Sequence, residues 1–435
     1  MRTLGFTLAL MLTTALLVTL LFVLPPVLLL GGLILLIAGL SFTAVGRQIG
    51  SVARVGIATI PKRLGASAVV VVGIAGVVGV LVGLLAMGAG FERTLKQTGN
   101  DDTVIVLQAG AQSEAASALA HDTATIISQA PQILRNAEGR PIVSPELLVG
   151  ARLRKKNTGH DTNVAMRGVG ERAWELRPRV RIIAGRKFKS GLHELIVGQS
   201  AHQQFSGTEI GDALKLNGQS WTVVGIFDSG DAHNSELWAD TDVVGSAFRR
   251  GSGKTSLALQ LTSAGAFDAF NALLASDPRL RVNALTTLQY YSRQAQGLAK
   301  LTRILGATIG AIMALGAIFG ALNAMYSAVA ARAREIATLR AIGFLGVPVI
   351  VSVLVETMLL AATGGVLGAA IAWLLLDGFI ASTMGSSGQI VFAFDVSPAL
   401  LWNGLKWALA IGLVGGLFPA VRAARMPIVT GLREL

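Results

Sequence analysis

The chain has 435 residues, of which 52% are hydrophobic and 14% are charged, and its mean hydropathy of +0.61 is too high for an ordinary soluble protein. It contains no cysteine, which excludes a disulfide framework and a thiolate metal site. The net charge is +12, but residues 92–293 hold 23 Lys or Arg against 20 Asp or Glu, so most of the excess flanks apolar runs. This distribution is typical of membrane topology, whereas nucleic-acid binding would need the excess on a soluble face.

Residues 1–46 predict an additional N-terminal hydrophobic hairpin of two spans. Residues 4–24 and 27–45 each approach the roughly 20 residues that cross a bilayer, and Pro25 cannot continue the first helix. Because the turn is tight, one kinked span or a re-entrant pair remains an alternative. A signal peptide is disfavoured because the apolar run is too long and no cleavage site follows it.

Residues 47–63 predict a cytoplasmic segment in the membrane interface, since four Lys or Arg residues lie among apolar ones without an acidic residue. Residues 64–90 predict a transmembrane helix, and residues 91–284 an α+β domain long enough for its own core. The elements expected in this domain are strands at 103–107, 193–197, 213–227 (with a hairpin turn at Asn217-Gly218) and 257–261, and helices at 113–130 and 264–275.

Residues 285–330 predict a stalk that continues into a transmembrane helix. A continuous helix over residues 286–326 would be about 60 Å long, twice the hydrocarbon thickness, and would project well outside the bilayer. Its glycines four residues apart favour a close helix neighbour, either in the same bundle or in a second copy. These glycines are Gly306, Gly310, Gly316 and Gly320.

Residues 331–345 predict a short basic helix on the cytoplasmic surface between two spans. Ile336, Leu339 and Ile342 fall on one side of it, which gives an apolar stripe and a basic face. Gly343 can adopt the left-handed conformation that ends a helix. Such a helix can contact a soluble partner or serve only as a positive-inside anchor.

Residues 346–376 predict the next transmembrane helix, and Gly364, Gly365 and Gly368 near its middle are expected packing positions. Glu356 is the only acidic residue within a predicted span, which makes it a functional candidate. A proton relay would need ionisable partners in neighbouring spans. A structural hydrogen bond near the cytoplasmic boundary is therefore favoured.

Residues 377–398 predict a periplasmic loop, and residues 399–435 the last transmembrane helix with a cytoplasmic tail. Trp402, Lys406 and Trp407 at its start are typical of an aromatic girdle with a snorkelling lysine. The expected fold is an α-helical integral membrane protein of about six transmembrane helices with an inserted α+β extracytoplasmic domain. Six spans place four basic segments on one side and this domain on the other.

No catalytic, cofactor-binding or metal-binding residue is predicted. The segment GSGKT at residues 251–255 ends like a phosphate-binding loop, but the position that requires Gly is Phe248. The five histidines lack the i, i+4 spacing of a helical zinc site.

Three groups of residues carry a resemblance to a known family. They are Asn323 and Met325 with AARAREIATLRAIG after them, Glu356 ahead of Gly364, and GLFPAVRAARMPIVTGLREL at the end of the chain. The inserted domain adds IIAGRKF, ELIVG and WTVVGIF in this order. Over residues 55–435 the chain resembles the FtsX-like, MacB-type permeases of ABC transporters, and its inserted domain is similar to the MacB-like periplasmic domain.

The resemblance implies four core spans with the periplasmic domain between the first two, to which residues 1–45 are an addition. It implies a homo- or heterodimer with cytoplasmic ABC ATPase subunits, in which ATP and Mg²⁺ are bound by the partner ATPase. The membrane would be the bacterial inner membrane. The residues expected to couple the chain to the ATPase are Arg332, Arg334, Glu335, Arg340 and Gly343.

The predicted spans contain few polar groups, which favours motion over passage of a hydrophilic solute. The hypothesis is that ATP hydrolysis in the partner displaces the periplasmic domain and so moves an amphiphile, a lipoprotein or a drug, with membrane lipids around the chain and a periplasmic adaptor and an outer-membrane channel as further partners. The alternative is an FtsX-like signalling subunit that activates a cell-wall hydrolase without moving a solute.

Overall fold

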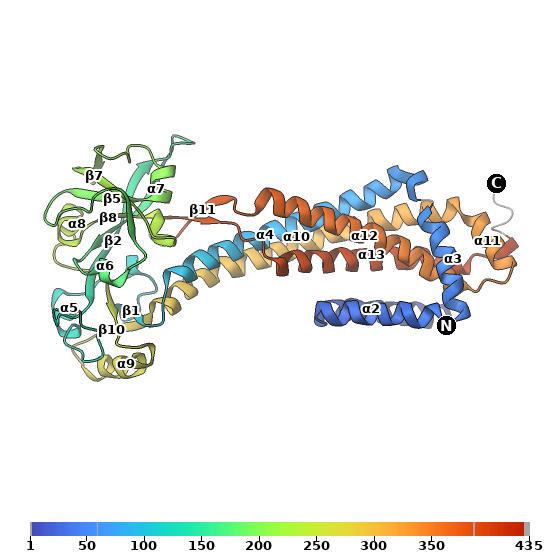
Figure 1. Ribbon diagram of the computed structural model, residues 1–435, viewed down its shortest axis with the longest axis horizontal. Helices are drawn as coiled ribbons and strands as arrows, with labels where there is room; N and C mark the ends of the chain where they lie inside the picture. Colours follow the sequence, from blue (N-terminus) through green and yellow to red (C-terminus); the bar gives the residue numbers. More distant parts are fainter. Residues whose placement is uncertain (1, 59, 386–387, 430–435) are drawn as a thin grey trace. The chain divides into compact units, whose positions relative to one another are not determined.

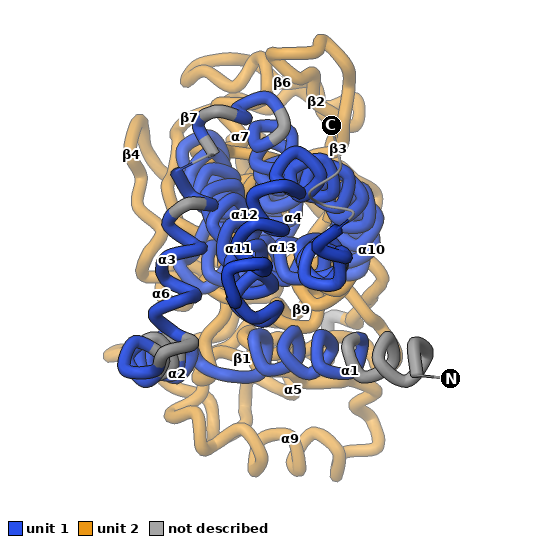
Figure 2. Tube along the Cα trace, turned by 90° about the vertical axis from the view of Figure 1, so that its right-hand side faces the viewer, with its two compact units in different colours: residues 1–87, 301–377, 395–435 blue, residues 88–300, 378–394 orange. Residues whose placement is uncertain are grey.

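The computed structural model describes residues 2–58, 60–385 and 388–429, which fall into two compact units. Unit 1 comprises residues 1–87, 301–377 and 395–435, and unit 2 comprises residues 88–300 and 378–394 (Figure 2). Two helices, α4 and α10, contribute residues to both units.

Unit 1 is helical, and its long helices α4, α10, α12 and α13 run side by side (Figures 1 and 2). Its elements are α1 (Arg2–Val23), α2 (Pro26–Ser41), α3 (Ala44–Ala58), η1 (Ile60–Arg63), α4 (Leu64–Thr98), α10 (Thr287–Ala331), α11 (Ala333–Ala341), α12 (Gly346–Leu376) and α13 (Pro398–Arg425). The last helix continues through Pro419 to Arg425.

Four helices among the described residues are long and apolar enough to cross a membrane, so the expected count of six spans is not confirmed. These are Ser67–Thr98, Thr287–Ala331, Gly346–Leu376 and Pro398–Arg425. The N-terminal segment does form two helices that break at the prolines. However, α2 has 16 residues, which at 1.5 Å per residue extend about 24 Å and fall short of the roughly 30 Å of hydrocarbon.

Close packing of α12 on two neighbours depends on its glycines. Gly364 and Gly368 lie against the backbone of α4, where a Cβ on Gly368 would overlap the carbonyl oxygen of Ala75. On the other side, a Cβ on Gly365 would lie 2.7 Å from the Cβ of Ala408 in α13. Any side chain at these positions would force the helices apart.

The glycines of α10 divide into two groups. Gly306 and Gly310 face α4, with Cβ positions 3.6 Å from Leu84 and 3.3 Å from Leu81. Gly316 and Gly320 have no heavy atom of the described chain within 4 Å of their Cβ positions, apart from their own helix. Only the first pair therefore packs against a neighbour within the chain.

The N-terminal helix α1 packs on α13 through Lys406. This side chain is 8% exposed and its Nζ donates a hydrogen bond to the carbonyl oxygen of Phe22, 3.3 Å away, in the last turn of α1. A cation at a helix C-terminus is favourable because the last carbonyl groups carry partial negative charge. The expectation of a snorkelling lysine is wrong, because the apolar segment before Pro25 offers an internal acceptor.

Unit 2 is built on one mixed sheet with the strand order β10-β1-β9-β2-β3-β8-β5-β7-β4, and β6 pairs with β7. Its strands are β1 (Thr103–Gln108), β2 (Val143–Arg154), β3 (Asp161–Val169), β4 (Arg181–Gly185), β5 (Glu194–Gly198), β6 (Ala213–Leu216), β7 (Gln219–Asp228), β8 (Leu237–Asp240), β9 (Ser256–Gln260) and β10 (Val282–Thr286). Its short helices are η2 (Glu114–Ala116), α5 (His121–Ile127), α6 (Ala173–Leu176), α7 (Gln199–Gln204), η3 (Ala232–Ser235), α8 (Thr241–Ala247), η4 (Ala264–Ala266) and α9 (Phe267–Ser276).

Strand β2 is shared by two lobes of this sheet. Residues 143–146 pair with β9, and residues 147–154 pair with β3. We name the part with β1, β9 and β10 lobe A, and the part with β3 to β8 lobe B. Each lobe has its own core, in which Phe270 and Leu257 are central to lobe A and Trp221 and Phe205 to lobe B.

The sequence patterns predicted some elements of this domain correctly and others wrongly. The hairpin turn at Asn217-Gly218 is present, with positive φ at both residues as a two-residue type I′ turn requires. The helix expected over residues 113–130 is wrong, because only η2 and α5 form there. Ser113 and Ser117 adopt extended backbone conformations instead.

The segment expected to be a loop at residues 377–398 contains a β-hairpin that belongs to unit 2. Its strands are β11 (Ile380–Met384) and β12 (Gln389–Ala393). The Val391 amide donates to the hydroxyl of Ser235, 2.9 Å away. Gly388 lies so close to Ala165 of β3 that a Cβ there would overlap its backbone. The hairpin is therefore docked on lobe B.

A buried ionic cluster joins the two lobes. Arg167 of β3 is 2% exposed and lies 2.8 Å from Glu114, 2.9 Å from Glu146 and 2.8 Å from Glu236. Arg177 makes a second contact with Glu146, at 2.6 Å. Burial alone would raise the pKa of Glu146, but the two guanidinium groups hold it at about 2, so this carboxylate stays charged at physiological pH.

We expect Arg167→Met to destabilise the domain by roughly 3–5 kcal/mol, because it leaves buried carboxylates without their counter-charge. Chemical unfolding of the full chain in detergent, followed by tryptophan fluorescence, measures the loss. Arg186→Met is the matched control, since the Arg186–Glu194 pair is exposed on the arginine side and should contribute far less to stability. Equal losses for the two variants would contradict the role of the cluster.

We also expect Gly368→Ala to lower the thermal unfolding midpoint of the detergent-solubilised chain, with a cost of roughly 1–3 kcal/mol for overpacking. Its new methyl group would meet the backbone of α4. Gly316→Ala is the control, because its methyl group would meet no atom of a neighbouring helix within 4 Å. If both variants behave alike, the glycine contact with α4 does not limit stability.

Candidate functional site

The coupling helix, which we define as residues 332–343 around α11, begins at a break in the helical path. Arg332 ends the run of α10 with φ −110° and ψ 11°, and α11 starts at Ala333. The Arg332 side chain turns inward and is 7% exposed in total. Its Nη1 lies 3.2 Å from Oε2 of Glu356, and its Nε lies 3.2 Å from Oε2 of Glu335. Arg332 is therefore not on the outer face of this helix.

Glu356 connects three elements of unit 1. Besides Arg332, it lies 3.9 Å from Nη2 of Arg63, at the end of η1. Gly56 of α3 covers this pair, since a Cβ there would lie 3.4 Å from both Arg332 Nη1 and Glu356 Oε2 and 3.3 Å from Ser352 Oγ. The intramembrane acid thus anchors the start of the coupling helix to α12, η1 and α3.

The other residues expected to couple to an ATPase lie on or near the surface. Arg334 is exposed, and the Glu335 side chain is 56% exposed. Arg340 is half-buried and donates to the carbonyl oxygen of Met426. Gly343 is exposed and has φ +107°, the left-handed conformation that ends the helix.

The apolar stripe expected on this helix is only partly buried. Ile336 packs in a cluster with Met325, Val349 and Ala423. Ile342 is 72% exposed, because it follows the last helical residue and no longer shares the inward face. Exposed Arg334 and Ile342 together give the coupling helix a mixed basic and apolar outer surface, which suits contact with another protein.

Arg63 and Gly56 also belong to this site, although the sequence predicts neither of them. Arg63 lies in the basic segment before α4, where its charge signals the membrane interface. Nothing in the local pattern pairs it with an acidic residue almost 300 positions later. That pairing depends on how α3, η1 and α12 pack.

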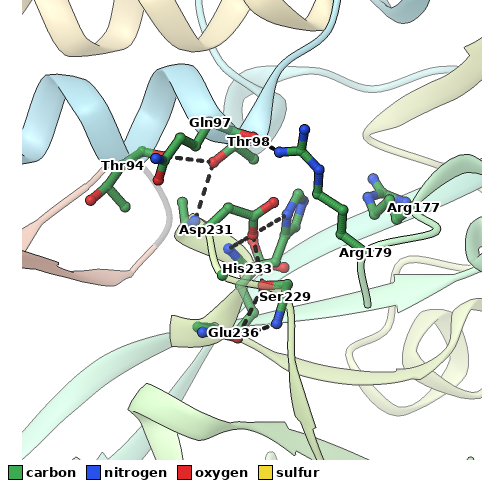
Figure 3. A network of polar contacts seen from close by, with 12 residues as sticks. Thr94, Gln97, Thr98, Arg177, Arg179, Ser229, Asp231, His233 and Glu236 are labelled. Atoms are coloured by element: carbon green, nitrogen blue, oxygen red, sulfur yellow. Dashed lines mark hydrogen bonds and ion pairs between the residues drawn. The ribbon is translucent and has the colours of Figure 1, made fainter. Parts of the chain in front are cut away.

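A second polar network surrounds η3 in unit 2 (Figure 3). Oδ1 of Asp231 accepts hydrogen bonds from the amide of His233, at 2.9 Å, and from the hydroxyl of Ser229, at 2.7 Å. The Asn234 side chain bonds to Ser229 and Asp228. Burial would raise the pKa of Asp231, but His233 and these donors lower it. The turn is therefore a rigid, internally bonded loop.

The described residues show no group of three or more His, Asp or Glu side chains placed to hold a metal ion. The segment GSGKT at residues 251–255, which ends like a phosphate-binding loop, stabilises the fold through its side chains. Lys254 is 6% exposed and lies 2.6 Å from Asp242, and Thr255 accepts a bond from the Leu148 amide. Both side chains therefore form contacts that stabilise lobe B and its border with lobe A.

Two family models match the chain. The MacB-like periplasmic core domain matches residues 67–276, and the FtsX-like permease C-terminal domain matches residues 307–428. The uncharacterized ABC transporter permease YknZ of Bacillus subtilis is 24% identical over 385 residues, which cover 82% of this chain and 92% of that protein. A second permease of the same organism, YvrN, is 24% identical over 399 residues, or 84% of this chain and 93% of that protein.

The macrolide export ATP-binding/permease protein MacB of Sodalis glossinidius is 28% identical over 323 residues, which cover 67% of this chain and 46% of that longer protein. Among solved structures, the periplasmic region of MacB from Actinobacillus actinomycetemcomitans is 16% identical with a TM-score of 0.34, and covers 43% of this chain and 89% of that one. The extracellular domain of YknZ is 14% identical with a TM-score of 0.33, over 42% of this chain and 100% of that one.

The two family models together extend from the first long helix to the last, and relatives that align over nearly their whole length are permeases. The chain therefore belongs to the FtsX-like, MacB-type permeases of ABC transporters.

Proposed function

We propose that this permease converts ATP hydrolysis in a separate cytoplasmic ATPase into motion of its MacB-like domain, and that this motion exports or extracts an amphiphilic substrate, a lipoprotein or a drug. The observation that carries the proposal is α10, one unbroken helix of 45 residues, about 68 Å long. Residues 287–300 of it belong to unit 2 and residues 301–331 to unit 1. Such a helix passes a displacement from one end to the other because its hydrogen bonds run along its axis.

The anchoring of the coupling helix supports this proposal. Arg332 directly follows α10 and is fixed to Glu356 on α12, so the outer face around Arg334 cannot move without α10 and α12. An ATPase that pushes on this face would therefore act on two long helices together. In this scheme ATP and Mg²⁺ are bound by the partner ATPase, and this chain has no catalytic role.

The pairing of polar side chains in the long helices argues against a hydrophilic pathway through them. Glu356 is paired with Arg332, and Lys406 bonds to a backbone oxygen of α1. A substrate that is already outside the membrane, or in its outer leaflet, does not need such a pathway. The complex would lie in a bacterial inner membrane as a dimer of permease chains, with a periplasmic adaptor and an outer-membrane channel as further partners.

Charge reversal on the outer face tests the partner contact. We expect Arg334→Glu to reduce co-purification of the cognate ATPase roughly tenfold or more, because the exposed guanidinium faces the partner. Arg250→Glu, an exposed position in unit 2, is the charge-matched control and should leave the yield unchanged. An undiminished yield and ATPase rate for Arg334→Glu would remove the support for coupling at this helix.

Neutralising Glu356, the partner of Arg332, tests the coupling to ATP hydrolysis separately from binding of the ATPase. We expect Glu356→Gln to destabilise the chain by roughly 3 kcal/mol or more, because buried Arg332 loses its counter-charge. The ATPase should still co-purify, but its stimulation by substrate should fall. Glu92→Gln in the exposed Glu92–Lys96 pair is the control, with an expected cost of about 1 kcal/mol or less. Full stimulation in Glu356→Gln would show that the anchor is not needed.

A further inference from the structure

The two lobes of unit 2 differ in how they are joined to the long helices. Lobe A is joined by the backbone itself, since β10 (Val282–Thr286) runs directly into α10 and β1 follows shortly after α4. These two strands also pair with each other. Lobe B has no such connection, because its strands occur in the chain between β2 and β9. Any displacement of the helices reaches lobe B through side chains and sheet contacts.

The turn η3 receives two of these contacts from the ends of the long helices. The amide of Ala232 donates a hydrogen bond to Oγ1 of Thr98, the last residue of α4, at 3.1 Å (Figure 3). The hydroxyl of Tyr291 in α10 lies 3.5 Å from Nε2 of His233, and the two rings meet edge to face. Both helices that enter unit 2 therefore contact the same four-residue turn.

A third contact comes from the β-hairpin between α12 and α13. The amide of Val391 in β12 donates to Oγ of Ser235, which is 3% exposed, at 2.9 Å. This hairpin is the segment of unit 2 that lies between α12 and α13 in the chain. The turn η3 is therefore contacted by α4, by α10 and by the hairpin, which are the segments through which the chain enters or leaves unit 2.

The surroundings of η3 make these few bonds matter. A hollow of about 80 Å³ lies beside the turn, lined in part by Gln97, Thr98, Asp231, His233 and Tyr291. Where a hollow replaces dense packing, fewer van der Waals contacts hold the two sides together. On the side of lobe B, by contrast, η3 is internally bonded and continues directly into β8.

We propose that η3 is the clamp through which displacement of α4, α10 and the hairpin enters lobe B, with Thr98 and Ser235 as positioning residues. This inference rests on the motion proposed above for the MacB-like domain. Loss of the two hydroxyl acceptors leaves lobe A attached through its backbone and leaves lobe B without two of its three contacts at the clamp. Lobe B then follows the helices less closely when the ATPase turns over, through β2 and the ionic cluster of Arg167.

The absence of cysteine from the sequence allows a direct test by distance measurement. A cysteine introduced at Ser220 in lobe B, which is exposed, gives one spin label in each of the two permease chains of the full complex with its ATPase in lipid nanodiscs, and this lobe B pair reports the displacement of lobe B. The distance distribution is compared without nucleotide and after trapping with ATP and vanadate. A second variant with a cysteine at exposed Asn271 in each permease chain gives the lobe A pair.

We expect the nucleotide-dependent change of the lobe B pair to fall at least twofold in the double variant Thr98→Val, Ser235→Ala, with the ATPase rate within twofold of the parent. The single variant Thr98→Ser keeps the hydroxyl that accepts from the Ala232 amide and should show the same nucleotide-dependent change as the unaltered chain. Thr94→Val is the matched control, because its hydroxyl is not part of the contact with η3. The lobe A pair should respond alike in all variants.

The possible outcomes distinguish failure of the clamp alone from failure of the proposed function. A full lobe B response in the double variant overturns the clamp and leaves the motion of the domain intact. A shifted distribution already without nucleotide, with an unchanged response to ATP, assigns the two hydroxyls a merely structural role and also overturns the clamp. If the parent complex shows no response in either pair, the proposed motion fails, and the clamp fails with it.

Discussion

The structure depends on one constraint, which is that backbone crossing a bilayer must satisfy its own hydrogen bonds. In this chain the constraint produces helices that do not stop at the lipid boundary. The helix α10 keeps its hydrogen-bond ladder for 45 residues, and α4 keeps it for 35. Both helices contribute residues to each unit.

Buried arginines organise both units in the same physical way. In unit 1, Arg332 fixes the start of the coupling helix to Glu356, and in unit 2, Arg167 holds carboxylates of both lobes. A buried ion pair adds little net stability over apolar packing, but it tolerates very few alternative arrangements, since an unpaired buried charge costs several kcal/mol. These pairs therefore suit positions where one relative orientation of helices or lobes has to be kept.

The arrangement supports a division of roles within a permease that works with a partner ATPase. On the coupling helix Arg334 is exposed, whereas Arg332 is buried against Glu356. Within unit 2, lobe A continues from the long helices through the backbone, whereas lobe B contacts them through η3 and is joined to lobe A through β2 and the Arg167 cluster.

The sequence by itself determined the long helices, the inserted domain, the left-handed end at Gly343 and the family, because hydrophobic period, length and glycine conformation are local properties. It also identified Glu356 as an unusual charge. Only the tertiary structure decided that Arg332 faces inward to meet it, that Lys406 bonds to α1, and that the segment after α12 docks on Ser235 as a hairpin. Each of these depends on which distant atoms come within hydrogen-bond range, and a linear pattern of charge and hydropathy does not encode that distance.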